Sequence, residues 1–513
     1  MRFIHFLILF IAADFLLLFS CKSPEQERFE AYIKEGEILA ATYCTTCHRE
    51  SPPELLNKKT WVFDVLPQMG PRLGIRKYKT LHYNRIHSML GAKFPVMEQE
   101  QWDNIVDYFY ASSPDSLPKQ DFNKQPIIDC KTFLAYPFTN DLSSSSIITL
   151  SEIDTAKKYI FVCDAGNSTL FKFDYAGNLL DTMQLASPST SMHIEHDFFD
   201  MTLVGILHPN NENLGQIVRY EYNEKFESEK NEVIIDSLYR PVSSIYFDFN
   251  YDGFKDYLVC EYGNDIGRLS LYFAKEDSQF ERYIIEDIPG SMMVKIHDFN
   301  KDGFMDIVAL FAQGDEKIMI YYNDGEGNFR NNFSMAARFP SVYGSMYFDI
   351  HDFNQDGFMD IVYVNGDNFD YSQILKPYHG IRILENDGNN LFNEKYFYPI
   401  YGAGKAKVAD FDLDGDSDII VSSNFADMEN NPERGIIYLE NIEEYHFNAY
   451  AFEASAQNQW NTIEVEDFDE DGDLDVIIGA MNLSNVLKVQ KGQSKEDIVI
   501  NRTSLLLLEN KTY

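Results

Sequence analysis

The nine residues DFNKDGFMD at positions 298–306 decide the fold of this chain, because the same pattern occurs four more times. The other copies are DFNYDGFKD from Asp248, DFNQDGFMD from Asp352, DFDLDGDSD from Asp410 and DFDEDGDLD from Asp467. Consecutive copies begin 50, 54, 58 and 57 residues apart, and each leads into a short apolar run such as IVAL or IIVS. Self-similarity at a period of this size indicates an architecture of repeated supersecondary units.

Two weaker copies extend the series toward the N-terminus. Residues 197–200 (DFFD), followed by MTLVGIL, begin 51 positions before Asp248. Residues 158–163 (KYIFVC) are followed by LFKFDYAGNLL and have no acidic loop. The series therefore predicts seven units between residues 131 and 513.

Short β-type runs alternate with turn residues within each unit, as in IMIYYNDGEGNF at 318–329, and no unit keeps a helical period. Four strands in a unit of this length are typical of a propeller blade. A linear β-helix is the competing architecture, but its repeats are much shorter. The sequence predicts an all-β, seven-bladed β-propeller for residues 131–513.

The shared pattern D-F-[DN]-x-D-G-x-x-D resembles the FG-GAP or VCBS repeat, which is also found in the N-terminal propeller of integrin α-chains. The resemblance covers about three-quarters of the chain. It implies a β-propeller, and other proteins with these repeats act as surface adhesion or glycan-binding modules.

The repeated loops have the side chains of a calcium site. Oxygens at positions 1, 3, 5 and 9, with the main-chain carbonyl of position 7, can surround one cation, and glycine at position 6 permits the sharp turn. Calcium, a hard ion that takes roughly six to eight oxygen ligands, suits such a cage. We predict about five structural Ca²⁺ sites. Their side-chain ligands are Asp248, Asn250, Asp252 and Asp256; Asp298, Asn300, Asp302 and Asp306; Asp352, Asn354, Asp356 and Asp360; Asp410, Asp412, Asp414 and Asp418; and Asp467, Asp469, Asp471 and Asp475.

The charge balance agrees with cation binding. The chain has 43 basic and 81 acidic residues, a net charge of −38. This excess argues against nucleic acid and against an anionic membrane surface as partners. The ligand positions hold three carboxylates in each of the first three loops and four in each of the last two. Such clusters repel one another unless cations offset the charge.

A different motif lies near the N-terminus. Cys44-Thr45-Thr46-Cys47-His48 is the C-x-x-C-H of c-type haem attachment, in which two thiols join the haem and the adjacent histidine ligates its iron. A redox dithiol does not need the histidine, and no second Cys/His pair follows at zinc spacing. We predict a covalent haem c on Cys44 and Cys47, with His48 as an iron ligand.

The flanking segments resemble small class I cytochromes c over residues 31–112. The stretch GEILAATY before the motif resembles their N-terminal helix. In EQEQWDNIVDYF, an apolar stripe at i, i+3, i+4 and i+7 predicts a helix that resembles their C-terminal one, which crosses the first. The stripe consists of Trp102, Ile105, Val106 and Phe109. A small all-α cytochrome c domain is therefore expected ahead of the propeller, joined to it by a linker at 113–130.

The second axial ligand of the iron is expected to be a methionine. Trp61 to Met69 resembles the W-x-x-x-V-x-x-M stretch of some cytochrome subunits, although the Trp–Met spacing is one residue longer here. We favour Met69, with Met89 as the alternative. Met97 is read as a core contact, and His82 and His87 are the bis-histidine alternatives.

Residues 1–20 are expected to be a secretion signal. Met1 and Arg2 precede an apolar segment that ends in Leu-Phe-Ser-Cys, which resembles the bacterial lipobox. The resemblance implies that Cys21 carries the lipid and that residues 21–30 form a tether. A retained transmembrane helix is the alternative, but Asp14 in mid-segment disfavours it. We expect an outer-membrane lipoprotein that faces the periplasm or the cell surface.

Three functions are compatible with these features. The first is an electron-transfer protein whose propeller docks a protein or glycan ligand, with a redox protein or quinol-linked partner at the membrane. The second is a haem-coupled propeller dehydrogenase similar to quinoproteins. The blades of quinoproteins usually carry tryptophan docking motifs, whereas only one tryptophan, Trp460, lies in the predicted propeller here. The third is a surface adhesion or glycan-binding lipoprotein, which leaves the haem motif unexplained. Because no nucleophile elbow, phosphate loop or catalytic zinc motif is present, we predict no catalytic residues and favour the first.

Overall fold

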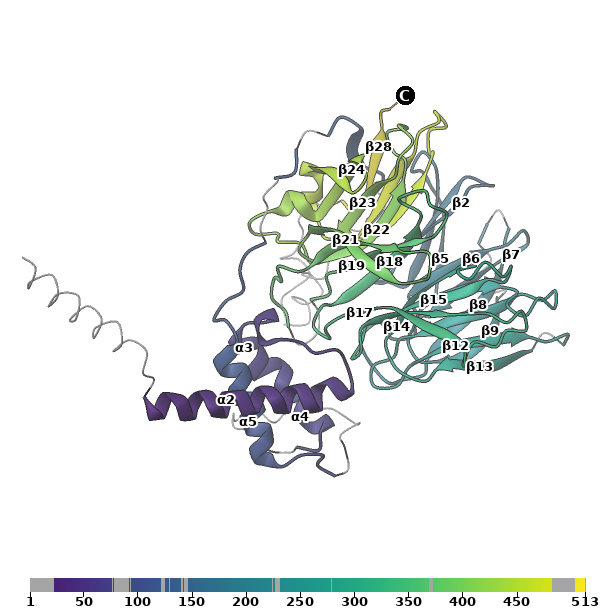
Figure 1. Cartoon of the computed structure of the whole chain (residues 1–513). Coiled ribbons are helices and arrows are strands. Elements are labelled where there is room, and N and C mark those ends of the chain that lie inside the picture. Colours follow the sequence, from purple (N-terminus) through teal and green to yellow (C-terminus); the bar gives the residue numbers. More distant parts are fainter. Residues whose placement is uncertain are drawn as a thin grey trace, which may run out of the picture. The chain divides into compact units, whose positions relative to one another are not determined.

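A computed structural model describes the chain at residues 23–75, 77, 92, 94–120, 125–128, 130–139, 142, 146–223, 225–226, 231–277, 279–368, 372–481 and 503–512. The chain divides into two compact units, Met1–Leu117 and Pro118–Tyr513. The first is helical and the second consists of β-sheets (Figure 1).

The N-terminal unit is built from short helices. Its elements are α2 (Pro24–Tyr43), the 3₁₀ turn η1 (Cys44–Thr46), η2 (Pro53–Leu55), α3 (Lys58–Thr60), the π-turn η3 (Trp61–Val65), α4 (Leu66–Arg72) and α5 (Gln99–Ser112). Ser23 begins α2 with a capping box, in which its hydroxyl accepts from Gln26 N and the Gln26 side chain accepts from Ser23 N. Within the described residues, no helix is long and apolar enough to cross a membrane.

Helices α2 and α5 pack closely at Gly36. A Cβ atom at this position would lie 2.3 Å from the carbonyl oxygen of Asn104 and 2.7 Å from the Cβ of Tyr108. One turn earlier, the Tyr32 hydroxyl donates to Asp107 Oδ2 at 2.9 Å. The predicted apolar stripe of α5 is present, and all four of its residues are buried. The small all-α region expected ahead of the propeller therefore exists.

Seven four-stranded antiparallel sheets make up the second unit. We number them as blades 1 to 7 in chain order, and the strands of a blade run from the inner to the outer edge. Blade 1 contains β2 (Ile148–Asp154), β3 (Tyr159–Asp164), β4 (Thr169–Asp174) and β5 (Leu179–Gln184). Blade 2 contains β6 (Ser189–Ile194), β7 (Phe198–Leu203), β8 (Gly215–Glu221) and β9 (Asn231–Leu238). Blade 3 contains β10 (Pro241–Phe247), β11 (Asp256–Glu261), β12 (Arg268–Ala274) and β13 (Phe280–Glu286).

The later blades repeat this arrangement. Blade 4 contains β14 (Ser291–His297), β15 (Asp306–Phe311), β16 (Lys317–Tyr321) and β17 (Phe333–Arg338). Blade 5 contains β18 (Ser345–His351), β19 (Asp360–Asn365), β20 (Gly380–Asn386) and β21 (Phe392–Pro399). Blade 6 contains β22 (Ala403–Ala409), β23 (Asp418–Ser423), β24 (Ile436–Glu443) and β25 (His446–Ala451), with η5 (Pro432–Gly435) before β24. The turn η6 (Glu453–Gln457) leads into blade 7.

Blade 7 is completed by the beginning of the unit. It contains β26 (Trp460–Glu466), β27 (Asp475–Ala480) and β28 (Leu505–Asn510), and its outermost strand is β1 (Phe133–Pro137). Strand β1 pairs antiparallel with β28, from Phe133 opposite Asn510 to Pro137 opposite Leu506. The inner strand of each blade contacts that of the next, and β26 contacts β2, which closes the ring. The seven-bladed propeller predicted from the repeats is confirmed.

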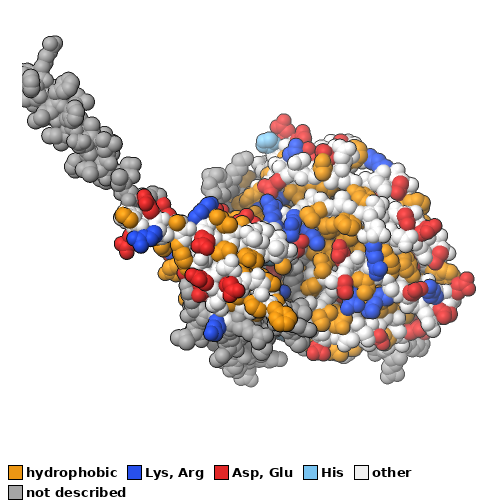
Figure 2. All heavy atoms as spheres, turned by 60° about the horizontal axis from the view of Figure 1, so that its bottom comes forward, with side chains coloured by type: hydrophobic (Ala, Val, Ile, Leu, Met, Phe, Trp, Pro, Cys, Tyr) orange, Lys and Arg blue, Asp and Glu red, His pale blue; other side chains and the backbone are white. Residues whose placement is uncertain are grey.

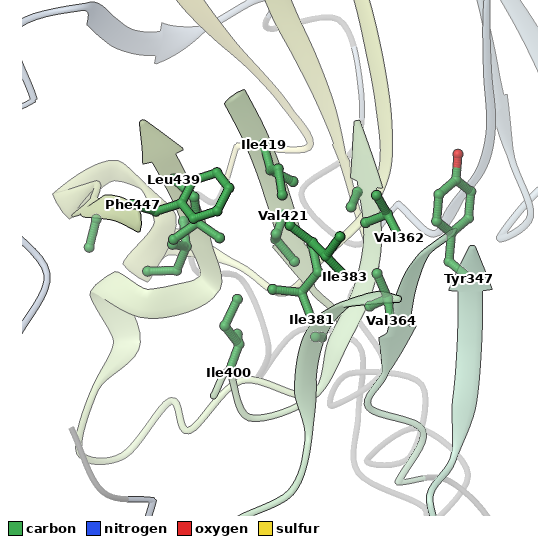
Figure 3. Packing of buried hydrophobic residues seen from close by; sticks show 14 residues of the cluster. Tyr347, Val362, Val364, Ile381, Ile383, Ile400, Ile419, Val421, Leu439 and Phe447 are labelled. Carbon is green, nitrogen blue, oxygen red and sulfur yellow. The ribbon is translucent and has the colours of Figure 1, made fainter. Parts of the chain in front are cut away.

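The core lies between neighbouring blades. Figure 3 shows one such layer, in which Val362 and Val364 of blade 5 and Ile381 and Ile383 of the same sheet face Ile419 and Val421 of blade 6. These side chains are almost completely buried. Because β19 and β23 are buried on both faces, their sequences read as continuous apolar runs rather than alternating ones.

The segment expected to be a linker makes contacts with the propeller at its described residues. Gln120 N donates to the Tyr401 hydroxyl at 2.9 Å, and Gln120 Nε2 donates to His379 O at 2.8 Å. Ile127 forms a parallel bridge with Tyr450 on the outer strand of blade 6. The chain thus follows the propeller before it enters β1.

We predict that Gly36→Val destabilises the helical unit by about 1–3 kcal/mol or more, because the added side chain collides with the backbone of α5. The loss should appear in the thermal unfolding of the helical circular dichroism signal. Ala41→Val, at an exposed position of α2, is the matched control and should cost well under about 1 kcal/mol. Equal effects of the two changes would contradict the close packing at Gly36.

Candidate cation loops and thiol pair

The five acidic loops occupy one position in five blades. Each connects the first strand of its blade to the second, in blades 3 to 7. In blades 1 and 2 the corresponding connections are residues 155–158 and 195–197, and the full acidic pattern is absent from both. Each position-9 aspartate begins the second strand, as in Asp306 at the start of β15.

The backbone of each loop is left-handed at two positions. Position 4 has φ between 55° and 64°, at Tyr251, Lys301, Gln355, Leu413 and Glu470. Position 6 is glycine in all five loops, with φ between 85° and 103°. At four of these glycines a Cβ would meet no atom within 4 Å, so the requirement for glycine comes from the backbone angle and not from lack of space.

Hydrogen bonds inside each loop hold the carboxylates of positions 1 and 5 in place. In the loop of blade 4, Asp298 accepts from Asp302 N at 3.1 Å and from Gly303 N at 2.8 Å. Asp302 in turn accepts from Phe304 N at 2.9 Å. The other four loops repeat these bonds. The backbone thus orients the predicted ligand oxygens around the loop interior.

The position-9 carboxylate joins three segments of its blade. In blade 4, Asp306 Oδ2 accepts from Phe299 N at 2.9 Å, and Oδ1 accepts from Asn323 N at 2.8 Å, after the third strand. The equivalent aspartates of the other four loops make the same two bonds. All five are essentially inaccessible to solvent. Position 9 is therefore a structural link as well as a predicted ligand.

In two loops the structure brings three carboxylates within reach of one ion. Oxygens of Asp410, Asp412 and Asp418 lie within 4.8 Å of one another in blade 6, as do those of Asp467, Asp469 and Asp471 in blade 7. In blades 3 to 5 position 3 is asparagine, and its amide donates to the position-5 carboxylate, as Asn300 does to Asp302 at 2.8 Å. The donor set is all oxygen, which fits a hard cation such as calcium.

An asparagine that sequence reasoning missed also supports these loops. Asn323 Nδ2 donates to Phe249 O, at position 2 of the preceding blade's loop, at 3.0 Å. Asn510 Nδ2 makes the same bond to Phe411 O at 2.7 Å. Asparagine recurs at or just after the end of the third strand in YYND, LEND, LENI and LENK. In blade 5 the bond comes from a different residue, because Asn390 Nδ2 donates to Phe299 O at 3.4 Å, while Asn386 Nδ2 donates to Met359 O.

Burial raises the pKa of each position-9 carboxyl in the ion-free propeller. The pKa of Asp256, Asp306, Asp360 and Asp475 rises from 3.8 to about 6, and that of Asp418 to about 7. Backbone hydrogen bonds lower these pKa values, but desolvation outweighs them. An ionised carboxylate at position 9 is therefore costly unless a cation accompanies it.

Acidic side chains are spread over the face shown in Figure 2, with apolar and basic side chains between them. No continuous acidic patch is visible on that face of the described residues. The strongest local grouping of carboxylates is within the loops, and not on a broad surface.

The two thiols of the C-x-x-C-H motif are free. Cys44 begins η1 directly after α2, and the Cys47 amide donates to Cys44 O at 3.4 Å. Cys44 is half-buried and Cys47 exposed, and neither forms a disulfide. The His48 Nδ1 lies 2.8 Å from Arg49 O and can donate a hydrogen bond to it. In the neutral tautomer that makes this bond, Nε2 has the lone pair.

Burial raises the pKa of the Cys44 thiol to about 11, with smaller contributions from Cys47 and Glu50. A reactive dithiol requires a lowered thiol pKa. The environment of Cys44 therefore disfavours the redox-dithiol interpretation of this motif.

Met69 lies half-buried on α4, immediately after a π-turn. In that turn the Leu66 amide donates to Trp61 O, five residues back instead of four. A π-turn takes up one more residue than an α-turn. The Trp61–Val65 spacing matches the W-x-x-x-V-x-x-M pattern, so the extra residue lies between Val65 and Met69, where the π-turn leads into α4. Met97 is 5% exposed and is a core contact, as expected.

Trp102 has a buried polar atom without a partner. Its side chain is 0% exposed, and its Nε1 has no hydrogen-bond acceptor among the described residues. The indole lies against α4, where a Cβ at Gly70 would be 3.7 Å from Nε1. By contrast, Trp61 Nε1 donates to Pro53 O at 2.8 Å. A buried N–H without an acceptor costs about 1–3 kcal/mol. An acceptor beside the Trp102 indole N–H would remove this cost.

Four predicted or alternative residues lie outside the described part of the chain. They are Cys21, His82, His87 and Met89.

Comparison with known families supports the propeller. A family model described as FG-GAP-like repeat matches residues 248–309 and 298–363, which span blade 3 to the second strand of blade 5. The chain contains FG-GAP-like repeats. The matched residues include the repeated acidic pattern from which the seven-bladed propeller was predicted.

Solved structures with a similar course of chain share little sequence with it. The N-terminal domain of Nup159 is 9% identical with a TM-score of 0.44, and covers 75% of this chain and 97% of its own. A streptogramin B lyase structure is 11% identical with a TM-score of 0.44, over 74% and 98%. A nidogen/laminin complex is 9% identical with a TM-score of 0.30, over 47% and 76%. A search of curated proteins found no match.

We predict that the metal-depleted propeller becomes less stable against unfolding as the pH rises from about 4 to about 7. Each position-9 carboxyl has a raised folded-state pKa, near 6 for Asp256, so the native state retains a proton that the unfolded chain releases. This stability is complete below the unfolded pKa and is lost as the pH passes the folded one.

Added calcium should reverse this trend, because it binds the ionised carboxylates. Thermal unfolding of the β-sheet circular dichroism signal across this pH range, with and without calcium, measures both effects. A metal-depleted stability that increases from about pH 4 to about pH 7 would contradict the assignment.

Proposed function

We propose that this chain is an extracytoplasmic electron-transfer protein. In this proposal Cys44 and Cys47 hold a covalent haem c, His48 ligates its iron, and a calcium-stabilised propeller docks a partner. The observation that carries the proposal is the pair of free thiols with an adjacent histidine at the end of a helix. When bound, the haem would supply an iron centre that gains and loses one electron.

Three features of the helical unit support a haem at this position. The Cys44 and Cys47 thiols are one 3₁₀ turn apart, and the high pKa of Cys44 suits a thioether, which carries no charge. The interaction of His48 Nδ1 with Arg49 O presents Nε2 as an iron ligand. The unpaired indole N–H of Trp102 suits a cofactor that brings its own acceptors, and a haem has two propionate carboxylates.

Met69 remains our choice for the second axial ligand. It stands on α4 directly before Gly70, where the Trp102 indole packs. A π-turn at Trp61–Val65 leads into this helix. Turns of this kind are frequent at functional sites, which supports a role for the residues that follow it.

The propeller is proposed to bind a protein or glycan ligand. Its FG-GAP-like repeats are compatible with partner binding. A redox protein or a quinol-linked partner at the membrane would exchange electrons with the haem. Together with the signal and lipobox pattern at 1–21, this suggests a lipoprotein of the outer membrane that faces the periplasm or the cell surface.

The acidic loops of blades 3 to 7 are proposed to bind Ca²⁺ as structural ions. Their all-oxygen donors, the three-carboxylate groups of blades 6 and 7 and the costly burial of position 9 support this. Each ion would offset charge at a link between the loop and the second and third strands. This places no ion at a reacting centre, in keeping with a docking role.

Covalent haem attachment is the test of the proposed function. We expect the protein, purified from an expression host with cytochrome c maturation, to keep its haem after acid-acetone extraction and to give a c-type pyridine haemochrome spectrum. The Cys44→Ser/Cys47→Ser double variant should lose the haem on extraction. Cys130→Ser, at a half-buried thiol of the propeller unit, is the matched control and should keep it. Haem that extracts freely from the unaltered protein would refute covalent attachment.

The same preparation tests the axial ligand. Met69→Leu should abolish a sulfur-to-iron charge-transfer band, whereas Met97→Leu, at a buried core methionine, should retain it. A band retained in the Met69 variant would transfer the assignment to Met89.

Calcium binding is tested by removing one loop ligand. Asp302→Ala should reduce the bound calcium from five ions to four, as measured by calorimetric titration of metal-depleted protein. At a free concentration of about 100 Kd, the lost ion is worth about 2.7 kcal/mol of stability. Asp324→Ala, at an exposed aspartate in a turn of the same blade, is the control and should leave five ions bound. A protein that binds no calcium would refute the loop assignment.

A further inference from the structure

Neighbouring acidic loops contact one another through position 4. The Tyr251 ring of blade 3 meets the ring of Phe304, at position 7 of the blade 4 loop, edge-on with centroids 5.3 Å apart. The Lys301 Nζ of blade 4 lies 3.6 Å from the ring centroid of Phe358, at position 7 of blade 5. The left-handed backbone at position 4 directs these side chains out of their own loop.

The contact between blades 3 and 4 includes a hydrogen bond to the backbone. The Tyr251 hydroxyl accepts from the Met305 amide at 2.9 Å. That N–H belongs to the same peptide unit as the carbonyl of Phe304. In a trans peptide the N–H and the C=O point in opposite directions, so a partner that holds one also directs the other.

The geometry points to Tyr251 as a positioning residue for the cation loop of the next blade. By holding the Met305 N–H, its hydroxyl fixes the peptide whose carbonyl is the position-7 ligand of the blade 4 site. The inference rests on the proposed calcium binding and adds a ligand-orienting residue from outside the loop.

The Phe304 ring is also contacted by the turn at Gly325, which supports the positioning role of Tyr251. A Cβ at Gly325, in the turn after the third strand of blade 4, would lie 2.6 Å from the Phe304 ring. The ring is therefore enclosed between Tyr251 and the Gly325 turn. With its side chain and its peptide both restrained, Phe304 has little freedom to reorient its carbonyl.

The arrangement also couples two sites. Tyr251 stands at position 4 of the blade 3 loop, between the predicted ligands Asn250 and Asp252. An ion in that loop fixes the backbone of Tyr251, and Tyr251 in turn orients a ligand of blade 4. Calcium at either site should therefore raise the affinity of the other, since such coupling is reciprocal.

Tyr251→Phe isolates the hydroxyl, because it keeps the ring contact and removes the acceptor. We expect calorimetric titration of the full-length, metal-depleted protein to show five bound ions, with the affinity of one site reduced about three- to tenfold. In the Asp302→Ala background, the blade 4 site and its coupling to blade 3 are both absent. Tyr251→Phe should therefore leave the affinities of the four remaining sites unchanged.

Tyr283→Phe is the matched control. Its hydroxyl also accepts from a backbone amide of blade 4, at Arg330 N and 3.3 Å, but that amide is outside the acidic loops. This variant should bind calcium with unchanged affinity. Thermal unfolding at saturating calcium should confirm that both tyrosine variants fold.

The outcomes separate the inference from the function on which it rests. An isotherm unchanged by Tyr251→Phe, while Asp302→Ala loses one ion, would overturn the positioning role and keep the calcium sites. An equal weakening by Tyr251→Phe with and without Asp302 would also overturn it. A protein in which Asp302→Ala loses no ion would refute the calcium site and the positioning role together.

Discussion

The propeller depends on a carboxylate that is buried where three segments of a blade meet. In blades 3 to 7 the aspartate that begins the second strand accepts the amide of loop position 2 and an amide at the end of the third strand. These bonds fix the loop against the sheet, but the charge is expensive where water is excluded. The raised pKa of these groups expresses that cost. The cation proposed for each loop would offset this cost.

Blade 2 satisfies a buried carboxylate in a different way. Asp200 is inaccessible to solvent, and the Arg219 guanidinium binds both of its oxygens, at 2.8 and 2.9 Å. A bidentate arginine supplies charge and geometry together and needs no ion. Asp200 also accepts from the hydroxyl of Tyr257, on β11 of blade 3. This buried carboxylate is therefore held by side chains of two neighbouring blades.

The helical unit also depends on one close contact, between α2 and α5. Gly36 allows α2 and α5 to approach so closely that no side chain fits between them. Helix α2 ends at the thiol pair, while α5 carries Trp102, whose indole N–H has no acceptor among the described residues. The contact at Gly36 therefore connects the helix that ends at the cysteines proposed to hold the haem with the helix that carries Trp102, the proposed hydrogen-bond donor to the haem.

Local pattern determined much of this protein. The five D-F-[DN]-x-D-G-x-x-D copies, together with two weaker units toward the N-terminus, predicted the number of blades. The α5 stripe predicted a buried helix face. Both depend on periodicities that a linear sequence carries. The C-x-x-C-H motif likewise predicts its chemistry from adjacent residues. Contacts between distant segments required the tertiary structure. Three contacts join residues that lie far apart in the sequence. They are the pairing of β1 with β28 in blade 7, the hydrogen bond from Asn510 Nδ2 to Phe411 O and the hydrogen bond from the Met305 amide to the Tyr251 hydroxyl. The π-turn before Met69 also required it, since an added residue in a helix leaves no mark in composition or period.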